Sequence, residues 1–145
     1  MIVKNIALIE DNDNDSKKVF DLIEQFKREN NVTLNVVRFN SADSFLESYQ
    51  QIYSVILLDI QLPGTYGMQT AYKLREIDKT VSIIFITSMV QFAQKGYEVD
   101  AISFMVKPAN YFDFSLKLKK ALDIATMNEN RNISLNVKNG ISCKK

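Results

Sequence analysis

Three acidic residues and one lysine each follow a short apolar run, and together they could handle a charged ligand. The pairs of run and charge are Ile6–Ile9 with Glu10 and Asp11, Tyr53–Leu58 with Asp59, and Ala101–Val106 with Lys107. Apolar runs that stop at a charge are typical of buried parallel strands, whose carboxyl ends share one ligand-binding crevice. Carboxylates gathered there repel one another unless a cation joins them, and a hard cation with oxygen ligands suits them. Because a neighbouring lysine can receive a phosphoryl group's charge, the pattern predicts a metal-assisted phosphoryl-acceptor site with Asp59 as nucleophile.

The composition is that of one ordinary globular domain. The chain has 145 residues, of which 46% are hydrophobic and 24% charged. No apolar stretch approaches the roughly 20 residues of a membrane span, and the start of the chain lacks the layout of a signal peptide. The lone Cys143 excludes an internal disulfide and suits a reducing cytoplasm, so we expect a cytoplasmic protein with no membrane partner. The net charge of +1 argues against nucleic-acid binding by this segment alone.

The chain contains no histidine. Histidine acid–base catalysis, histidine-ligated zinc and a phosphohistidine intermediate are therefore excluded within it. Any phosphohistidine in its chemistry must belong to a partner.

The elements that must position these residues alternate between strand and helix. We expect strands near 4–9, 33–39, 53–58, 82–86 and 101–105, and helices near 14–29, 42–50, 66–77, 89–96 and 110–126. Apolar residues at helical spacing, such as Val19, Ile23 and Phe26, support the first helix, and Ser41 is a candidate N-cap for the second. Five strands alternating with five helices predict a three-layer α/β domain with right-handed crossovers.

The character of the sequence changes after about residue 126. Residues 127–132 are polar and predict a linker, whereas 133–137 alternate apolar and polar residues like an exposed strand. A lone strand cannot bury anything by itself. Two interpretations stay open, a frayed tail or the opening of a further domain, and we favour the second. The expected division is therefore 1–126 for the domain and 127–145 for a linker with the start of another.

Three other types of site would require different residues near the acidic segment or after Asp59. A calcium-binding EF-hand loop starting at Asp11 would need Gly and Glu where the chain has Ser16 and Leu22. A flavodoxin-like mononucleotide site would need a phosphate loop rich in Gly, Ser or Thr, and here that loop is acidic. A haloacid-dehalogenase-type phosphatase places a second Asp where this chain has Gln61. These mismatches exclude the calcium loop and argue strongly against the other two site types.

The remaining arrangement resembles the receiver domain of bacterial two-component response regulators over about residues 3–125. The matching residues are the acidic pair Glu10–Asp11, the phosphoacceptor Asp59, the switch hydroxyl Thr87, the switch aromatic Phe104, and Lys107 before Pro108. The resemblance implies a flavodoxin-like (βα)5 doubly wound parallel sheet with strand order 2-1-3-4-5. It also implies a signalling domain that catalyses its own phosphorylation and dephosphorylation and is not otherwise an enzyme.

The resemblance further implies a role for each residue. Mg²⁺, or Mn²⁺ in its place, would be held by Asp11, Asp59 and the backbone carbonyl of Gln61, with Glu10 acting through water. Lys107 would bind the phosphoryl group, and the peptide bond before Pro108 would be cis. Thr87 and Phe104 would switch the domain. Receivers commonly have tyrosine at the Phe104 position, so switching here would depend on ring packing alone.

Residues 89–101 and 133–140 look like those of LytTR-type regulators, which join a receiver to a β-rich DNA-binding domain. This implies a partner histidine kinase, homodimerisation on phosphorylation through the face of the fourth and fifth helices, and DNA contact only through a C-terminal domain. A stand-alone phosphorelay or output-binding receiver without DNA-binding activity stays open as the alternative.

Overall fold

The computed structural model describes residues 3–61, 67–88, 99–101 and 103–140, with side chains described as far as residue 129. The helices are α1 (Asp13–Asn30), α2 (Ala42–Glu47), α3 (Gly67–Ile77) and α4 (Tyr111–Gly140). The strands are β1 (Val3–Ile9), β2 (Thr33–Phe39), β3 (Tyr53–Leu58), β4 (Ser82–Thr87) and β5 (Ser103–Val106).

The five strands form one parallel sheet in the order β2-β1-β3-β4-β5. This order confirms the predicted doubly wound arrangement. The register aligns the last residues of neighbouring strands, for example Ile9 with Phe39 and Ile9 with Leu58. The residues that follow these strands therefore meet at one edge of the sheet.

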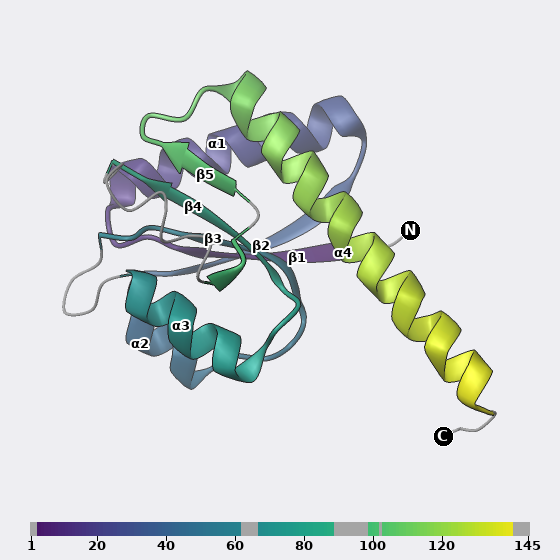
Figure 1. The fold of residues 1–145 in the computed structure, drawn as a ribbon. Helices are drawn as coiled ribbons and strands as arrows, with labels where there is room; N and C mark the ends of the chain where they lie inside the picture. Colours follow the sequence, from purple (N-terminus) through teal and green to yellow (C-terminus); the bar gives the residue numbers. More distant parts are fainter. Residues whose placement is uncertain (1–2, 62–66, 89–98, 102, 141–145) are drawn as a thin grey trace.

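Helices cover both faces of the sheet, α1 and α4 on one side and α2 and α3 on the other (Figure 1). Successive residues of each central strand point to opposite layers, as the two-residue period of a strand requires. In β3, Val55 and Leu57 pack with the α1–α4 core, whereas Ile56 and Leu58 pack with the α2–α3 core. All four side chains are fully buried. Burial on both faces explains why the strands have unbroken apolar sequences.

The helix starts agree with the local sequence. Ser41 caps α2 as predicted, since its hydroxyl accepts a hydrogen bond from the Ser44 backbone N–H at 3.1 Å. Asn12 caps α1 in the same way toward Asp15, so the cap is an amide and not one of the neighbouring acids. α2 ends three residues earlier than expected, and Tyr49 turns inward to pack its ring on Phe45.

α4 differs most from expectation, because its backbone stays helical to Gly140. The strand predicted over 133–137 is wrong, since the backbone there is helical. That residues 127–132 link two domains stays a prediction. No proline or glycine stands between Pro108 and Gly140, so nothing in that sequence forces the helix to end. The far end of α4 extends away from the sheet (Figure 1). Whether this segment opens a further domain stays a prediction.

The helix expected over 89–96 lies outside the described residues. Among the described residues, no helix is both long enough and apolar enough to span a bilayer.

Candidate functional site

The carboxyl ends of β1, β3 and β5 bring together the three charges that follow those strands. Backbone hydrogen bonds fix each residue at the end of its strand: Glu10 N–H donates to Phe39 O, Asp59 N–H to Ile9 O, and Lys107 N–H to Thr87 O. Glu10 and Asp59 are almost completely buried, at 2% and 5% exposure. Because the backbone on both sides is held by the sheet, these side chains have little freedom to separate.

The Lys107 ammonium lies among three carboxylates. Its Nζ atom is 2.7 Å from Glu10 Oε1, 2.7 Å from Asp59 Oδ2 and 2.8 Å from Asp15 Oδ2. A lysine has three N–H donors, so each carboxylate occupies one of them. The lysine predicted to receive a phosphoryl group is thus fully engaged by acidic side chains of its own chain.

The ionisation of the site follows from burial and these contacts. Burial raises the pKa of the Glu10 carboxyl, and the hydrogen bond from Lys107 only partly opposes that shift. Burial alone would lower the pKa of Lys107, but its hydrogen bonds with Asp15, Asp59 and Glu10 outweigh burial and hold the pKa above its ordinary value. Lys107 therefore stays charged at neutral pH.

Glu10, Asp11 and Asp59 form a cluster of oxygen donors that could hold a metal ion. One carboxylate oxygen from each lies within 4.8 Å of the others, and Asp11 is exposed to solvent while its two partners are buried. A set made only of oxygens suits a hard divalent cation such as Mg²⁺. The Gln61 backbone N–H donates to Asp59 Oδ1 at 3.0 Å, which places Gln61 beside the cluster. The ligand role of its carbonyl stays a prediction.

Thr87 and Phe104 lie on neighbouring strands. Thr87 is fully buried at the end of β4, and Phe104 is paired in register with Phe85, two residues before Thr87. The Phe104 ring packs on the Phe85 ring with centroids 6.4 Å apart and is partly buried against the α2–α3 core. This arrangement is compatible with their predicted switch roles, which stay predictions. The peptide bond between Lys107 and Pro108 is cis, as the resemblance implied.

The sequence analysis missed three residues that shape the site. Asp15, in the first turn of α1, contacts Lys107. Arg38 donates from Nε and Nη2 to the Glu10 carbonyl oxygen and from Nη1 to Asp13, which fixes the β1–α1 loop. Its place one residue before the end of β2, where the strands end at the acidic segment, was the available signal.

Gly67 is the third missed residue. Its N–H donates to Ile60 O at 2.6 Å, and a Cβ atom there would overlap the Asp59 carbonyl oxygen and lie 2.6 Å from the Ile60 Cα. Only glycine therefore lets α3 begin this close to the Asp59 backbone. No local sequence pattern predicts such a close approach of two backbone segments in the folded structure.

Comparison with known proteins agrees with this geometry. The family model of the response regulator receiver domain matches residues 6–119. The transcriptional regulatory protein CiaR of Streptococcus pneumoniae is 28% identical over 119 residues, covering 81% of this chain and 50% of CiaR. The sensory transduction protein LytT of Oceanobacillus iheyensis is 30% identical over 103 residues, covering 69% of this chain and 42% of LytT. The LytT match agrees with the resemblance to LytTR-type regulators.

A shorter match is the positive alginate biosynthesis regulatory protein of Pseudomonas aeruginosa, 39% identical over 67 residues, or 46% of this chain and 27% of that protein. The chain thus spans half or less of the length of these curated relatives.

Solved structures share the fold. The BeF3-activated receiver domain of DrrB aligns with a TM-score of 0.72 at 24% identity, covering 84% of this chain and 99% of that one. The response regulator StyR aligns with a TM-score of 0.75 at 18% identity, covering 91% of this chain and 65% of that one. At these identities the likeness shows the fold alone.

Proposed function

Because this chain belongs to the response regulator receiver family, we propose that Asp59 accepts a phosphoryl group from a histidine kinase and thereby switches a transcriptional regulator. One observation carries this proposal. The Asp59 carboxylate lies 2.7 Å from the Lys107 ammonium and within a cluster of Glu10 and Asp11 oxygens at the edge of a parallel sheet. The kinase must supply the histidine, since this chain has none.

The transfer step uses the Asp59 carboxylate as nucleophile. One of its oxygens attacks the phosphorus atom of the kinase phosphohistidine and forms a P–O bond. The P–N bond breaks, and its electron pair stays on the imidazole nitrogen. Lys107 donates to a phosphoryl oxygen, which fits the view that phosphoryl transfer is mostly positioning and charge stabilisation. Water reverses the modification by attacking phosphorus, so that phosphate leaves and the carboxylate returns.

Mg²⁺ is the proposed cation, and Mn²⁺ could replace it. Asp11, Asp59 and the Gln61 carbonyl would hold it directly, and Glu10 would do so through water. When bound, the ion offsets the repulsion between Asp59 and the negatively charged phosphoryl group. The described donors fit this assignment, because all are oxygens and the acidic cluster carries surplus negative charge.

Thr87 and Phe104 carry the change outward from the site. Thr87 donates its hydroxyl hydrogen to the phosphoryl group, and Phe104 fills the space that Thr87 leaves. The shared face of β4 and β5 supports this coupling, because Phe104 pairs with Phe85 two residues before Thr87. A charge change at Asp59 is thereby converted into a packing change at β5.

Intact-mass measurement after incubation with acetyl phosphate and Mg²⁺ tests the phosphoacceptor. The wild type should gain one phosphate and Asp59→Asn none. Asp21→Asn removes a carboxylate from α1 away from Asp59 and should label like the wild type. Equal labelling of the wild type and Asp59→Asn would contradict the proposal.

Transcriptional output is supported by the relative CiaR, whose name describes a transcriptional regulatory protein. With a net charge of only +1, this segment would act on DNA through a further domain that begins after residue 126. A kinase and DNA as partners imply a cytoplasmic protein, and this location is part of the proposal. Reading the gene beyond the codon for Lys145 discriminates this function from a stand-alone phosphorelay receiver.

Phosphorylation promotes pairing of two copies through the face of the fourth and fifth expected helices, the fifth of which is α4. The apolar residues that the expected fourth helix and the loop after it would add to this face, Val90, Phe92 and Tyr97, lie outside the described residues. Within the described part, Phe112 and Leu116 stand one turn apart on α4 with 74% and 55% of their surface exposed.

Sedimentation with and without beryllofluoride, a mimic of the aspartyl phosphate, measures this pairing. Phe112→Ser should weaken the association that beryllofluoride induces. Met127→Ser, which removes another exposed apolar side chain from α4, is the matched control. Unchanged association on adding beryllofluoride to the wild type would count against dimerisation.

A further inference from the structure

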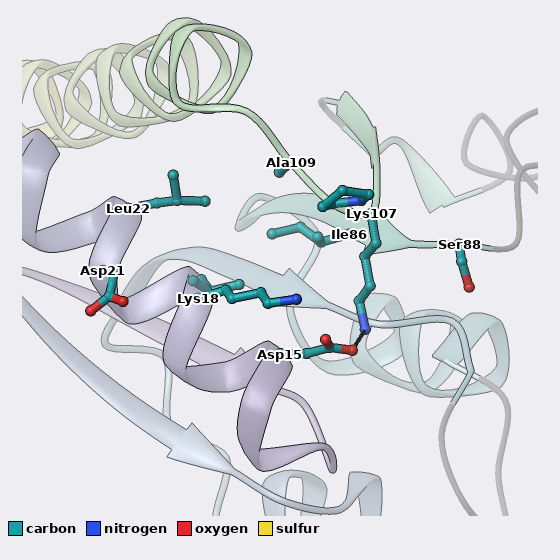
Figure 2. A pocket seen from close by; sticks show the side chains of 10 residues that line it. Asp15, Lys18, Asp21, Leu22, Ile86, Ser88, Lys107 and Ala109 are labelled. Carbon is teal, nitrogen blue, oxygen red and sulfur yellow. Dashed lines mark hydrogen bonds and ion pairs between the residues drawn. The ribbon is translucent and has the colours of Figure 1, made fainter.

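Among the described residues, three carboxylates contact Lys107. Glu10 belongs to the acidic pair and Asp59 is the phosphoacceptor, whereas Asp15 has no role in the proposed function. It lies in the first turn of α1, where its backbone N–H is held by the Asn12 cap at 2.9 Å. Its side chain crosses from α1 to the Lys107 ammonium, a contact of 2.8 Å (Figure 2). The helix start and the strand end therefore both hold this ion pair in place.

The surroundings of Asp15 differ from those of the other two carboxylates. Its side chain is 32% exposed, whereas those of Glu10 and Asp59 are 3% and 6% exposed. A cavity of about 550 Å³ opens beside it between α1 and the ends of β4 and β5. Asp15 and Lys107 line this cavity together, while Glu10 and Asp59 do not. Asp15 thus approaches the ammonium from the open side.

The three bonds to Lys107 leave no donor for a new ligand. A phosphoryl oxygen on Asp59 needs one N–H of Lys107, so one existing acceptor must give way. Glu10 is buried and is also held by the Asn12 backbone N–H at 3.2 Å, and Asp59 carries the new group itself. Asp15 is the acceptor that can leave at least cost, since water can solvate it. Lys18, three residues along α1 and lining the same cavity, offers it another cation (Figure 2).

We infer that Asp15 is a positioning residue that competes with the phosphoryl group for Lys107, resting on the proposed function of Asp59. In the resting domain it anchors the ammonium and adds a negative charge to the site. That charge favours a metal cation and disfavours an incoming phosphoryl group. Asp15 therefore raises the affinity for Mg²⁺ and lowers the affinity for the phosphoryl group.

Two titrations on each variant test this opposition. Calorimetry gives the affinity for Mg²⁺ alone and then the affinity for beryllofluoride at saturating Mg²⁺. Asp15→Asn should bind beryllofluoride about two- to fivefold more tightly and Mg²⁺ more weakly by a similar factor, the range expected for a partly exposed ion pair. Asp15→Glu, which keeps the charge, should restore both affinities toward the wild type.

Asp21→Asn is the matched control, because Asp21 lies on the same helix, lines the same cavity and carries the same charge. It should leave both affinities within error of the wild type. A purely structural role for Asp15 predicts that both affinities fall together with the melting temperature, and that result would overturn the inference. An unchanged affinity for beryllofluoride in Asp15→Asn would also overturn it.

The proposed function fails separately. If Asp59→Asn gains phosphate as the wild type does, Asp59 is not the acceptor. If the wild type is phosphorylated on Asp59 and Asp15→Asn shows no opposed change, only the inference about Asp15 is lost.

Discussion

Two buried aspartates at opposite ends of the sheet have opposite surroundings. Asp59 follows β3 at the carboxyl end, and Asp78 precedes β4 at the amino end; they are 5% and 9% exposed. The Asp78 carboxylate accepts hydrogen bonds from uncharged groups of nearby residues. Asp59 shares one ammonium with other carboxylates. The comparison separates a carboxylate that stabilises the fold from one that is available for chemistry.

The Asp78 carboxylate is satisfied by three hydrogen bonds. Tyr49 donates its hydroxyl to Oδ2 at 2.6 Å, and the backbone N–H groups of Thr80 and Val81 donate to Oδ1 at 3.1 Å each. Arg75 lies beside it and binds backbone carbonyls, including that of Val99 at 2.6 Å. One negative charge, three donors and a nearby cation leave Asp78 with a complete set of partners.

The Asp59 site has the opposite balance. Glu10, Asp15 and Asp59 contact Lys107, and Asp11 lies beside Glu10 and Asp59. Full ionisation of these four acids and the one lysine leaves a surplus of three negative charges. Such a surplus destabilises the folded state unless a cation is added. A buried carboxylate whose oxygens all accept hydrogen bonds from uncharged donors is a structural feature. A buried site with excess negative charge instead indicates a positively charged ligand.

Replacing Asp78 and Asp59 by alanine, one at a time, should give the largest difference in the free energy of unfolding between the structural and the chemical carboxylate. Asp78→Ala leaves the Tyr49 hydroxyl and two backbone N–H groups without their acceptor, so we expect a loss of about 3 kcal/mol in the free energy of unfolding. Asp59→Ala removes one of the mutually repelling charges and should cost clearly less. Urea unfolding without divalent metal measures both. Similar losses for the two variants would break the comparison.

Mg²⁺ should stabilise the protein through the Asp59 site alone. A ligand that binds only the folded state at 100 times its dissociation constant adds about 2.7 kcal/mol to the free energy of unfolding. Asp11→Asn should lose most of this increment, and Glu10→Gln should lose less, because we propose that Glu10 acts only through water. Unfolding with and without Mg²⁺ measures the increments. Equal losses for Asp11→Asn and Glu10→Gln would show that the two acids are misassigned.

Asp78→Asn is the control for the metal experiment. Its stability should be lower at every Mg²⁺ concentration, but the increment from Mg²⁺ should equal that of the wild type. A smaller increment would mean that the two ends of the sheet are energetically coupled.

The sheet could be predicted from the sequence because its strands are buried on both faces. Unbroken apolar runs such as 53–58, each ending at a charge, mark the strands and the edge where their ends meet. The end of α4 could not be predicted in the same way. Residues 133–137 alternate like a strand, but without a partner strand among the described residues the backbone continues as a helix.

Half of the site was predictable for the same reason. Glu10, Asp59 and Lys107 stand at strand ends, so their meeting follows from the strand order alone. The role of Asp15 depends on the rotation of α1, which turns its side chain back toward β5. Gly67 matters because of a contact with a backbone that is eight residues distant in sequence. Neither the rotation of a helix about its axis nor a close contact between two backbone segments produces a recognisable pattern of residue types in the sequence.

The smallest expected effect comes from removing a single hydrogen bond to Asp78. Tyr49→Phe removes only the hydroxyl that donates to Asp78 and keeps the ring, which packs on Phe45 with centroids 5.3 Å apart. A hydrogen bond to a charged carboxylate contributes about 1.5 kcal/mol, so the free energy of unfolding should fall by about that amount. The stabilisation by Mg²⁺ should not change, since Asp59 and its neighbours are untouched.

Tyr53→Phe, which removes the hydroxyl of the next ring in the same aromatic group, is the control and should lower the free energy of unfolding by less. If Tyr49→Phe costs no more than Tyr53→Phe, the short bond to Asp78 contributes nothing net to stability. The two backbone donors alone would then satisfy Asp78, and its difference from Asp59 would lie in the absence of surplus charge and not in the number of its partners.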